Sequence, residues 1–101
     1  MAQQVSGQVT VSTAGTAVAG PDIEGGVFQF QANPANTGTY CYVGSDGAGD
    51  VSSTTGFTLK KGQNTLILVV SNLDRLYFDS DTNGDKVDWI RLDKSSGDAV
   101  V

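Results

Sequence analysis

The chain has 101 residues, and its eleven acidic and six basic side chains give a formal net charge of −5. This length predicts a single domain over residues 1–101, and the acidic balance argues against a partner held through nucleic-acid phosphates. The sequence has no histidine, which excludes histidine-based catalysis, and its single cysteine, Cys41, excludes an internal disulfide. We therefore expect a protein that is not an enzyme and needs no cofactor.

The sequence also argues against a membrane partner. No apolar run approaches the roughly 20 residues that a membrane-spanning helix needs. The opening residues, MAQQ, lack the charged and apolar regions of a signal peptide. We therefore expect a chain that is made in the cytoplasm.

Apolar and polar residues alternate with a period of two, which predicts strands. In chain order the predicted strands cover residues 5–11, 27–31, 39–43, 57–59, 65–70, 76–78 and 87–92. The segment 65–70 is apolar at every position but the first, which is typical of a central strand. Turn residues separate the strands, so we expect an all-β fold: a small β-sandwich or jelly-roll-like barrel of seven to eight short antiparallel strands.

The two ends of the chain differ from its middle, because they are small, polar and poor in large apolar groups. They predict a flexible N-terminal arm over residues 1–8 and a C-terminal tail over residues 93–101. Each segment is either a frayed end or an arm that becomes ordered against a partner.

Two single residues invite a functional interpretation. Cys41 lies in the alternating run 39–43 without a nearby base, and is expected to be a buried core residue rather than a nucleophile. Trp89, the only tryptophan, is expected in the core of the last strand. An exposed Trp89 beside Tyr40 and Tyr42 would instead offer a stacking surface for a sugar.

The stretch DSDTNGD, residues 79–85, resembles the first half of a calcium-binding loop. Asp79, Asp81, Asn83 and Gly84 occupy positions 1, 3, 5 and 6 of such a loop, but position 12, which needs a bidentate acid, is Ile90. Strand-like residues flank the stretch on both sides. We therefore predict no specific metal site.

The same stretch has a simpler interpretation as a β-hairpin, because Asn83-Gly84 is a strong signal for a tight type I′ turn. Asp81, Asp85 and Asp88 are then solvated residues that discourage pairing between sheet edges. The remaining candidates for a weak cation at the turn are the following four residues: Asp79, Asp81, Asn83 and Asp85.

Four segments together resemble small structural proteins of tailed bacteriophages: TAGTAV (13–18), NTGTYCYVG (36–44), VSSTTGFTLKKGQ (51–63) and NLDRLYFDSDTNGDKVDWIRL (72–92). The order of the segments matches, and they cover most of the chain. The Asp-rich final turn and the insertion GSDGAGD (44–50) depart from the family pattern, and no catalytic motif is present to transfer.

The resemblance implies a virion structural protein, in particular a capsid decoration or cement protein on the capsid surface. Its expected partners are the major capsid protein at capsomer junctions and other copies of itself, first as a homotrimer and second as a dimer. Two alternatives stay open. One is a neck, tail or fibre-associated structural protein, and the other is a carbohydrate-binding module with a weak calcium site.

Overall fold

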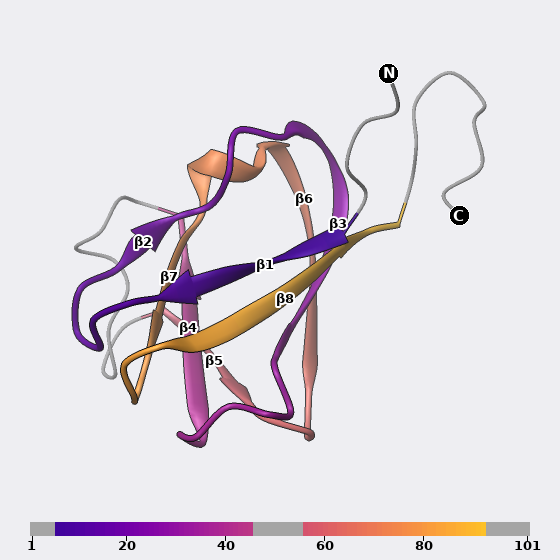
Figure 1. Ribbon diagram of the computed structural model, residues 1–101. Coiled ribbons are helices and arrows are strands. Elements are labelled where there is room, and N and C mark those ends of the chain that lie inside the picture. Colours follow the sequence, from indigo (N-terminus) through magenta and orange to yellow (C-terminus); the bar gives the residue numbers. More distant parts are fainter. Residues whose placement is uncertain (1–5, 46–55, 93–101) are drawn as a thin grey trace.

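The computed structural model describes residues 6–45 and 56–92, which form two packed antiparallel sheets (Figure 1). One sheet has the order β1-β8-β3-β6 and the other the order β2-β7-β4-β5. The strands are β1 (Ser6–Val11), β2 (Val18–Ala19), β3 (Glu24–Ala32), β4 (Tyr40–Gly44), β5 (Phe57–Lys60), β6 (Thr65–Asn72), β7 (Tyr77–Ser80) and β8 (Asp85–Arg91). A short 3-10 helix, η2 (Leu73–Arg75), joins β6 to β7. The predicted all-β sandwich is confirmed.

The core lies between the two sheets and is built by the alternation of strand residues. Phe28 and Phe30 of β3 are fully buried, and the ring of Phe28 meets Trp89 of β8 edge-on at 5.8 Å. Phe78 reaches Phe30 from the opposite sheet, with ring centroids also 5.8 Å apart. Trp89 and Cys41 are both buried, as their alternating patterns predicted. Within the described residues, no helix has the length and apolar character to cross a membrane.

The first strand, Ser6–Val11, agrees with the strand predicted over residues 5–11 but overlaps the arm predicted over residues 1–8. Ser6 pairs with Ile90 and Gln8 with Asp88, so residues 6–8 belong to β1 and the arm predicted over residues 1–8 is too long. Backbone pairing with β8 holds this polar segment in the sheet, although it buries few side chains. The rest of the arm and the tail over residues 93–101 lie outside the described residues.

The predicted hairpin around Asn83-Gly84 is wrong, because β7 and β8 belong to different sheets. The turn is a corner: Gly84 takes a positive φ of 83°, and its N–H donates to the Val11 carbonyl at 2.7 Å. The local turn signal was correct, but turn chemistry alone does not say whether the next strand returns to the same sheet.

The prediction that the segment 65–70 forms a central strand is also wrong. Strand β6 stands at the edge of its sheet, next to β3 (Figure 1). Its inner residues Leu66, Leu68 and Val70 pack against the core, whereas Ile67 and Val69 are 56% and 79% exposed on the outer face. A run that is apolar on both faces therefore marks an uncovered edge here rather than a strand between two layers.

Candidate interaction surface

The Asp-rich corner holds the loop between β1 and β2 from one side. Asp79 is buried, and its Oδ1 accepts hydrogen bonds from the Gly15 N–H at 2.9 Å and the Ser80 N–H at 2.8 Å. Asn83 accepts from the neighbouring Ala14 N–H at 2.8 Å. The acceptors for Gly15 and Ala14 satisfy loop N–H groups that no strand pairs.

On its other side the corner holds the loop between β3 and β4. Buried Asp85 accepts the Thr37 N–H at 2.9 Å on Oδ1 and the Gly38 N–H at 2.8 Å on Oδ2. A Cβ on Gly38 would lie 2.8 Å from Asp85 Oδ2 and 2.6 Å from Thr82 Oγ1, so only glycine fits this approach. Asn36 exchanges two further hydrogen bonds with the backbone of Lys86, each 2.8 Å long.

Asp81 is exposed but is also engaged. Its Oδ1 accepts the Tyr42 hydroxyl at 2.6 Å, and its Oδ2 accepts the Tyr40 N–H at 3.1 Å. Burial and this hydrogen bond to Asp81 raise the pKa of Tyr42 above its ordinary value. The phenol therefore stays protonated and keeps the corner attached to β4.

The four candidate cation ligands thus point to separate donors instead of a common centre. Asp79 and Asn83 face the loop that contains Gly15, whereas Asp81 and Asp85 face the segment that leads into β4. Within residues 6–45 and 56–92, no group of three or more histidine, cysteine or acidic side chains is placed to hold a metal ion. The structure places these residues as structural acceptors for backbone N–H groups.

Cys41 lies against the same corner. Its thiol donates to the Lys86 carbonyl at 3.6 Å and accepts from Asn36 Nδ2 at 3.4 Å. Burial, followed by the negative charges of Asp85 and Asp81, raises the pKa of Cys41 from 9.0 to about 12. A nucleophilic cysteine needs the opposite shift, because the thiolate is the reactive form.

The sugar-stacking surface considered for Trp89 is not formed. Trp89 is only 3% exposed, and its strand belongs to the other sheet from Tyr40 and Tyr42. Tyr42 is buried too, which leaves Tyr40 as the one exposed ring of the three. The three rings therefore share no surface.

A different surface stands out on the outer face of the β1-β8-β3-β6 sheet. Val69 of β6 pairs with Val27 of β3, and the Val27 carbonyl accepts the Leu92 N–H. In the next row of the register, Gln29 lies between Ile67 and Ile90. The members that share this uncovered apolar area, called the outer patch below, are Val27, Ile67, Val69, Ile90 and Leu92.

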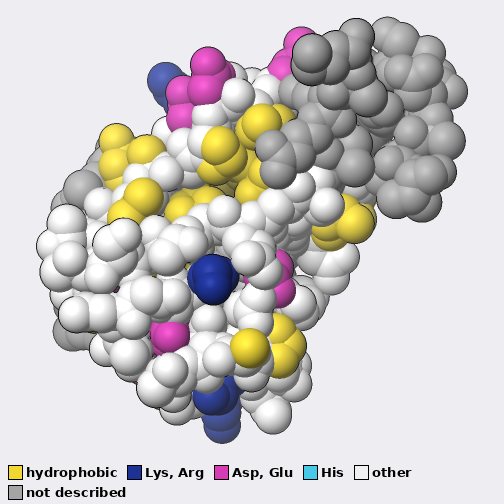
Figure 2. Space-filling view, viewed as in Figure 1, with side chains coloured by type: hydrophobic (Ala, Val, Ile, Leu, Met, Phe, Trp, Pro, Cys, Tyr) yellow, Lys and Arg dark blue, Asp and Glu magenta, His cyan; other side chains and the backbone are white. Residues whose placement is uncertain are grey.

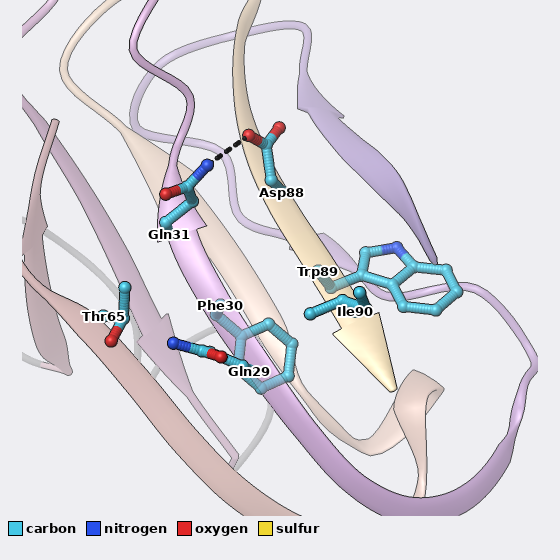
Figure 3. Close-up of a pocket in the computed structure, with 7 residues that line it drawn as sticks. All are labelled: Gln29, Phe30, Gln31, Thr65, Asp88, Trp89 and Ile90. Carbon is cyan, nitrogen blue, oxygen red and sulfur yellow. Dashed lines mark hydrogen bonds between the residues drawn. The ribbon is translucent and has the colours of Figure 1, made fainter. Parts of the chain in front are cut away.

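A shallow hollow of about 330 Å³ adjoins the outer patch on the same sheet (Figure 3). Gln29, Gln31, Thr65, Asp88 and Ile90 line it from three neighbouring strands. Asp88 accepts Gln31 Nε2 and Asn33 Nδ2, each at 2.9 Å, so both its oxygens are used. The hollow is thus lined by side-chain amides and by a carboxylate that is already hydrogen-bonded. These groups can contact a partner, but they form no acid–base pair.

The side of the molecule seen in Figure 2 carries no single dominant charge field. Lys, Arg, Asp and Glu side chains are scattered there in small groups, with hydrophobic atoms between them. Among the described residues, the outer patch gathers four of the six exposed large hydrophobic side chains, which makes it a candidate surface for binding another protein.

Comparison with known proteins gives no match: no family model fits the sequence, and no curated protein and no solved structure is similar to it. The candidate surface thus rests on the residues of this chain. Sequence reasoning missed Ile67 and Val69 as surface residues, because it placed their strand in the middle of a sheet. The missed signal was a run of five aliphatic residues, 66–70, in a strand without a charge, proline or glycine.

Proposed function

We propose that the protein is a non-enzymatic structural protein of a virion, a capsid decoration protein that binds the outer capsid at capsomer junctions and stabilises the shell. The resemblance of its ordered segments to tailed-phage structural proteins supports the virion assignment. The observation that carries a binding role is the outer patch, which presents Ile67 and Val69 to solvent while the acids of the corner are used internally.

In this role the sandwich acts as a rigid body that covers apolar surface on the assembled capsid. The major capsid protein is the proposed partner, and contact with the outer patch removes apolar area from water on both sides. A stable contact of this kind buries about 800 Å² on each partner. Because the decoration protein binds assembled shells and not free subunits, mass action shifts the equilibrium toward the shell.

The first test is the copy number in purified virions of the phage that encodes the chain. Quantitative mass spectrometry gives the ratio of this protein to the major capsid protein. A ratio near one, or a simple fraction such as one third, is the expected result for a protein spread over the capsid lattice. A ratio of a few per cent contradicts decoration and moves the protein to the neck or tail, and complete absence refutes a virion role.

The second test asks whether the outer patch is the capsid-binding surface. Ile90→Asp places a charge in the patch, while Thr10→Asp places the same charge on β1, outside the patch on the same sheet. Capsids stripped of decoration protein should bind the Ile90 variant at least about tenfold more weakly than the Thr10 control. Equal binding of the two variants would show that another surface contacts the capsid.

A further inference from the structure

Among the described residues, strand β6 is the longest edge strand of the sandwich, and it lacks the features that usually protect an edge. Edge strands normally carry a charge, a proline or a bulge, or are very short, because their free N–H and C=O groups would otherwise pair with another chain. Of the other edge strands, β2 has two residues, and β5 has four and ends at Lys60. Strand β1 has six residues without a charge, but its two apolar side chains, Val9 and Val11, are buried, so its outer face is polar. By contrast, β6 extends over eight residues with no charge and no proline, a length of about 27 Å.

The sequence of β6 is nearly palindromic in chemical character. From Asn64 to Asn72 it is N-T-L-I-L-V-V-S-N, and Leu68 is the midpoint. Antiparallel pairing of two copies about Leu68 joins residues of the same type. The resulting pairs are Leu66 with Val70, Ile67 with Val69, Thr65 with Ser71, and Leu68 with Leu68 of the second copy.

We propose that β6 is a self-association edge that pairs antiparallel with β6 of a second copy around a two-fold axis at Leu68. Two four-stranded sheets then become one continuous sheet of eight strands. This register keeps the faces of the sandwich in line, since Ile67 and Val69 face outward in both copies while Leu66 and Val70 face the core. A shift by one residue would place apolar core residues on the outer face of the joined sheet.

The chemistry of the edge favours a second copy over a charged partner. Each chain has a net charge of −5, but no ionisable side chain lies within β6, so two copies meet there without direct like-charge contact. Cross-strand pairs of aliphatic residues and of hydroxyl residues stabilise antiparallel sheets. A two-fold contact uses the same strand on both copies and is closed, which predicts a dimer, the second of the two oligomers expected from the sequence, and not the trimer expected first.

Single-strand pairing is a small interface, so we expect a dissociation constant in the micromolar range. Sedimentation equilibrium of the full chain between about 1 and 200 µM should show monomers converting to species of twice the monomer mass. A chain that stays monomeric over this range, or that forms trimers, contradicts the proposal. This inference does not depend on the proposed virion role, and its test needs no capsid.

The register can be tested with charges on two exposed positions. Ile67→Lys/Val69→Lys brings four lysines together, because position 67 of each copy faces position 69 of the other. Ile67→Glu/Val69→Glu does the same with acids. The matched control, Ile67→Lys/Val69→Glu, removes the same apolar groups but pairs each lysine with a glutamate of the second copy.

We expect both like-charge variants to dimerise at least about tenfold more weakly than the mixed variant. Net charge alone cannot produce this result, since the mixed variant lies between the other two in charge. If the three variants dimerise equally weakly, the pairing register is wrong. All three should remain folded, because positions 67 and 69 lie outside the core.

A cysteine cross-link tests the position of the two-fold axis independently. In Leu68→Cys the two new thiols face each other across the axis at a separation that suits a disulfide. In the control Val69→Cys they are offset by two residues along the strands, so their Cα atoms lie about 8 Å apart, which is too far. The native Cys41 is buried and does not compete. Selective oxidation of the Leu68 variant to a covalent dimer is expected, and equal cross-linking of both variants would place the axis elsewhere.

Discussion

The Asp-rich corner and strand β6 use their residues in opposite ways. The corner contains the groups that usually suggest a ligand site, yet its carboxylates accept hydrogen bonds from the loops on either side, such as the N–H groups of Gly15 and Gly38. Strand β6 has no reactive group, yet it exposes Ile67 and Val69, and within residues 6–45 and 56–92 no strand pairs with its outer edge. A cluster of acids can therefore be structural, while an uncharged strand can be the surface that meets a partner.

The largest expected effect comes from removing an acceptor in the corner. Asp85→Ala leaves the N–H groups of Thr37 and Gly38 without their acceptor in a buried place, and should lower the free energy of unfolding by about 3 kcal/mol. The matched change on the edge, Val69→Thr, should alter it by less than about 0.5 kcal/mol.

Urea titrations at about 1 µM protein, where self-association is negligible, measure both values. If Asp85→Ala does not fold at all, circular dichroism shows this directly, and the result agrees with the expected order. The contrast between the two regions fails if Asp85→Ala lowers the free energy of unfolding by less than Val69→Thr does.

The second prediction concerns alkaline pH and the thiol against the corner. Cys41 keeps its proton in the native protein until its pKa of about 12, whereas an ordinary thiol loses it near 9.0. Between these values the native state binds more protons than the unfolded state, so the free energy of unfolding falls as the pH rises. This stability is fully present below about pH 9 and is lost by at most about 1.4 kcal/mol per pH unit.

A comparison with Cys41→Ala isolates this contribution. Between pH 8 and 10.5 the wild type should lose about 2 kcal/mol more than the variant, in urea titrations under reducing conditions. Tyr42, whose pKa is also raised, is present in both proteins, and Cys41 is only the last of the causes that raise its pKa, so the contribution of Tyr42 largely cancels in the difference. An equal loss of stability in the two proteins would mean that the Cys41 thiol ionises within the folded protein near its ordinary pKa.

The period-two pattern predicted the strands, the sandwich and the burial of Cys41 and Trp89, because core-facing residues alternate wherever two sheets pack. Sheet order could not be predicted in the same way. Whether β7 and β8 pair depends on distant contacts, such as the hydrogen bond from Gly84 N–H to the Val11 carbonyl. The roles of the corner acids were missed for the same reason. Apart from the Ser80 N–H, the donors to Asp79, Asp81 and Asp85 lie between 39 and 64 residues away, as with Asp85 and Thr37.

The smallest expected effect is that of calcium. A site with a dissociation constant near 0.1 mM would add about 1.4 kcal/mol of stability at 1 mM Ca²⁺ and raise Tm by roughly 6–10 °C. We expect a shift below about 1 °C, because coordination would require Asp79 and Asp85 to release their backbone N–H partners and turn from different loops toward one point. Magnesium at the same concentration is the control for general ionic effects. A rise of several degrees with calcium alone would mean that the corner rearranges around the ion. The acids would then be structural acceptors without calcium and ligands with it, and the corner would differ from β6 only while no ion is bound.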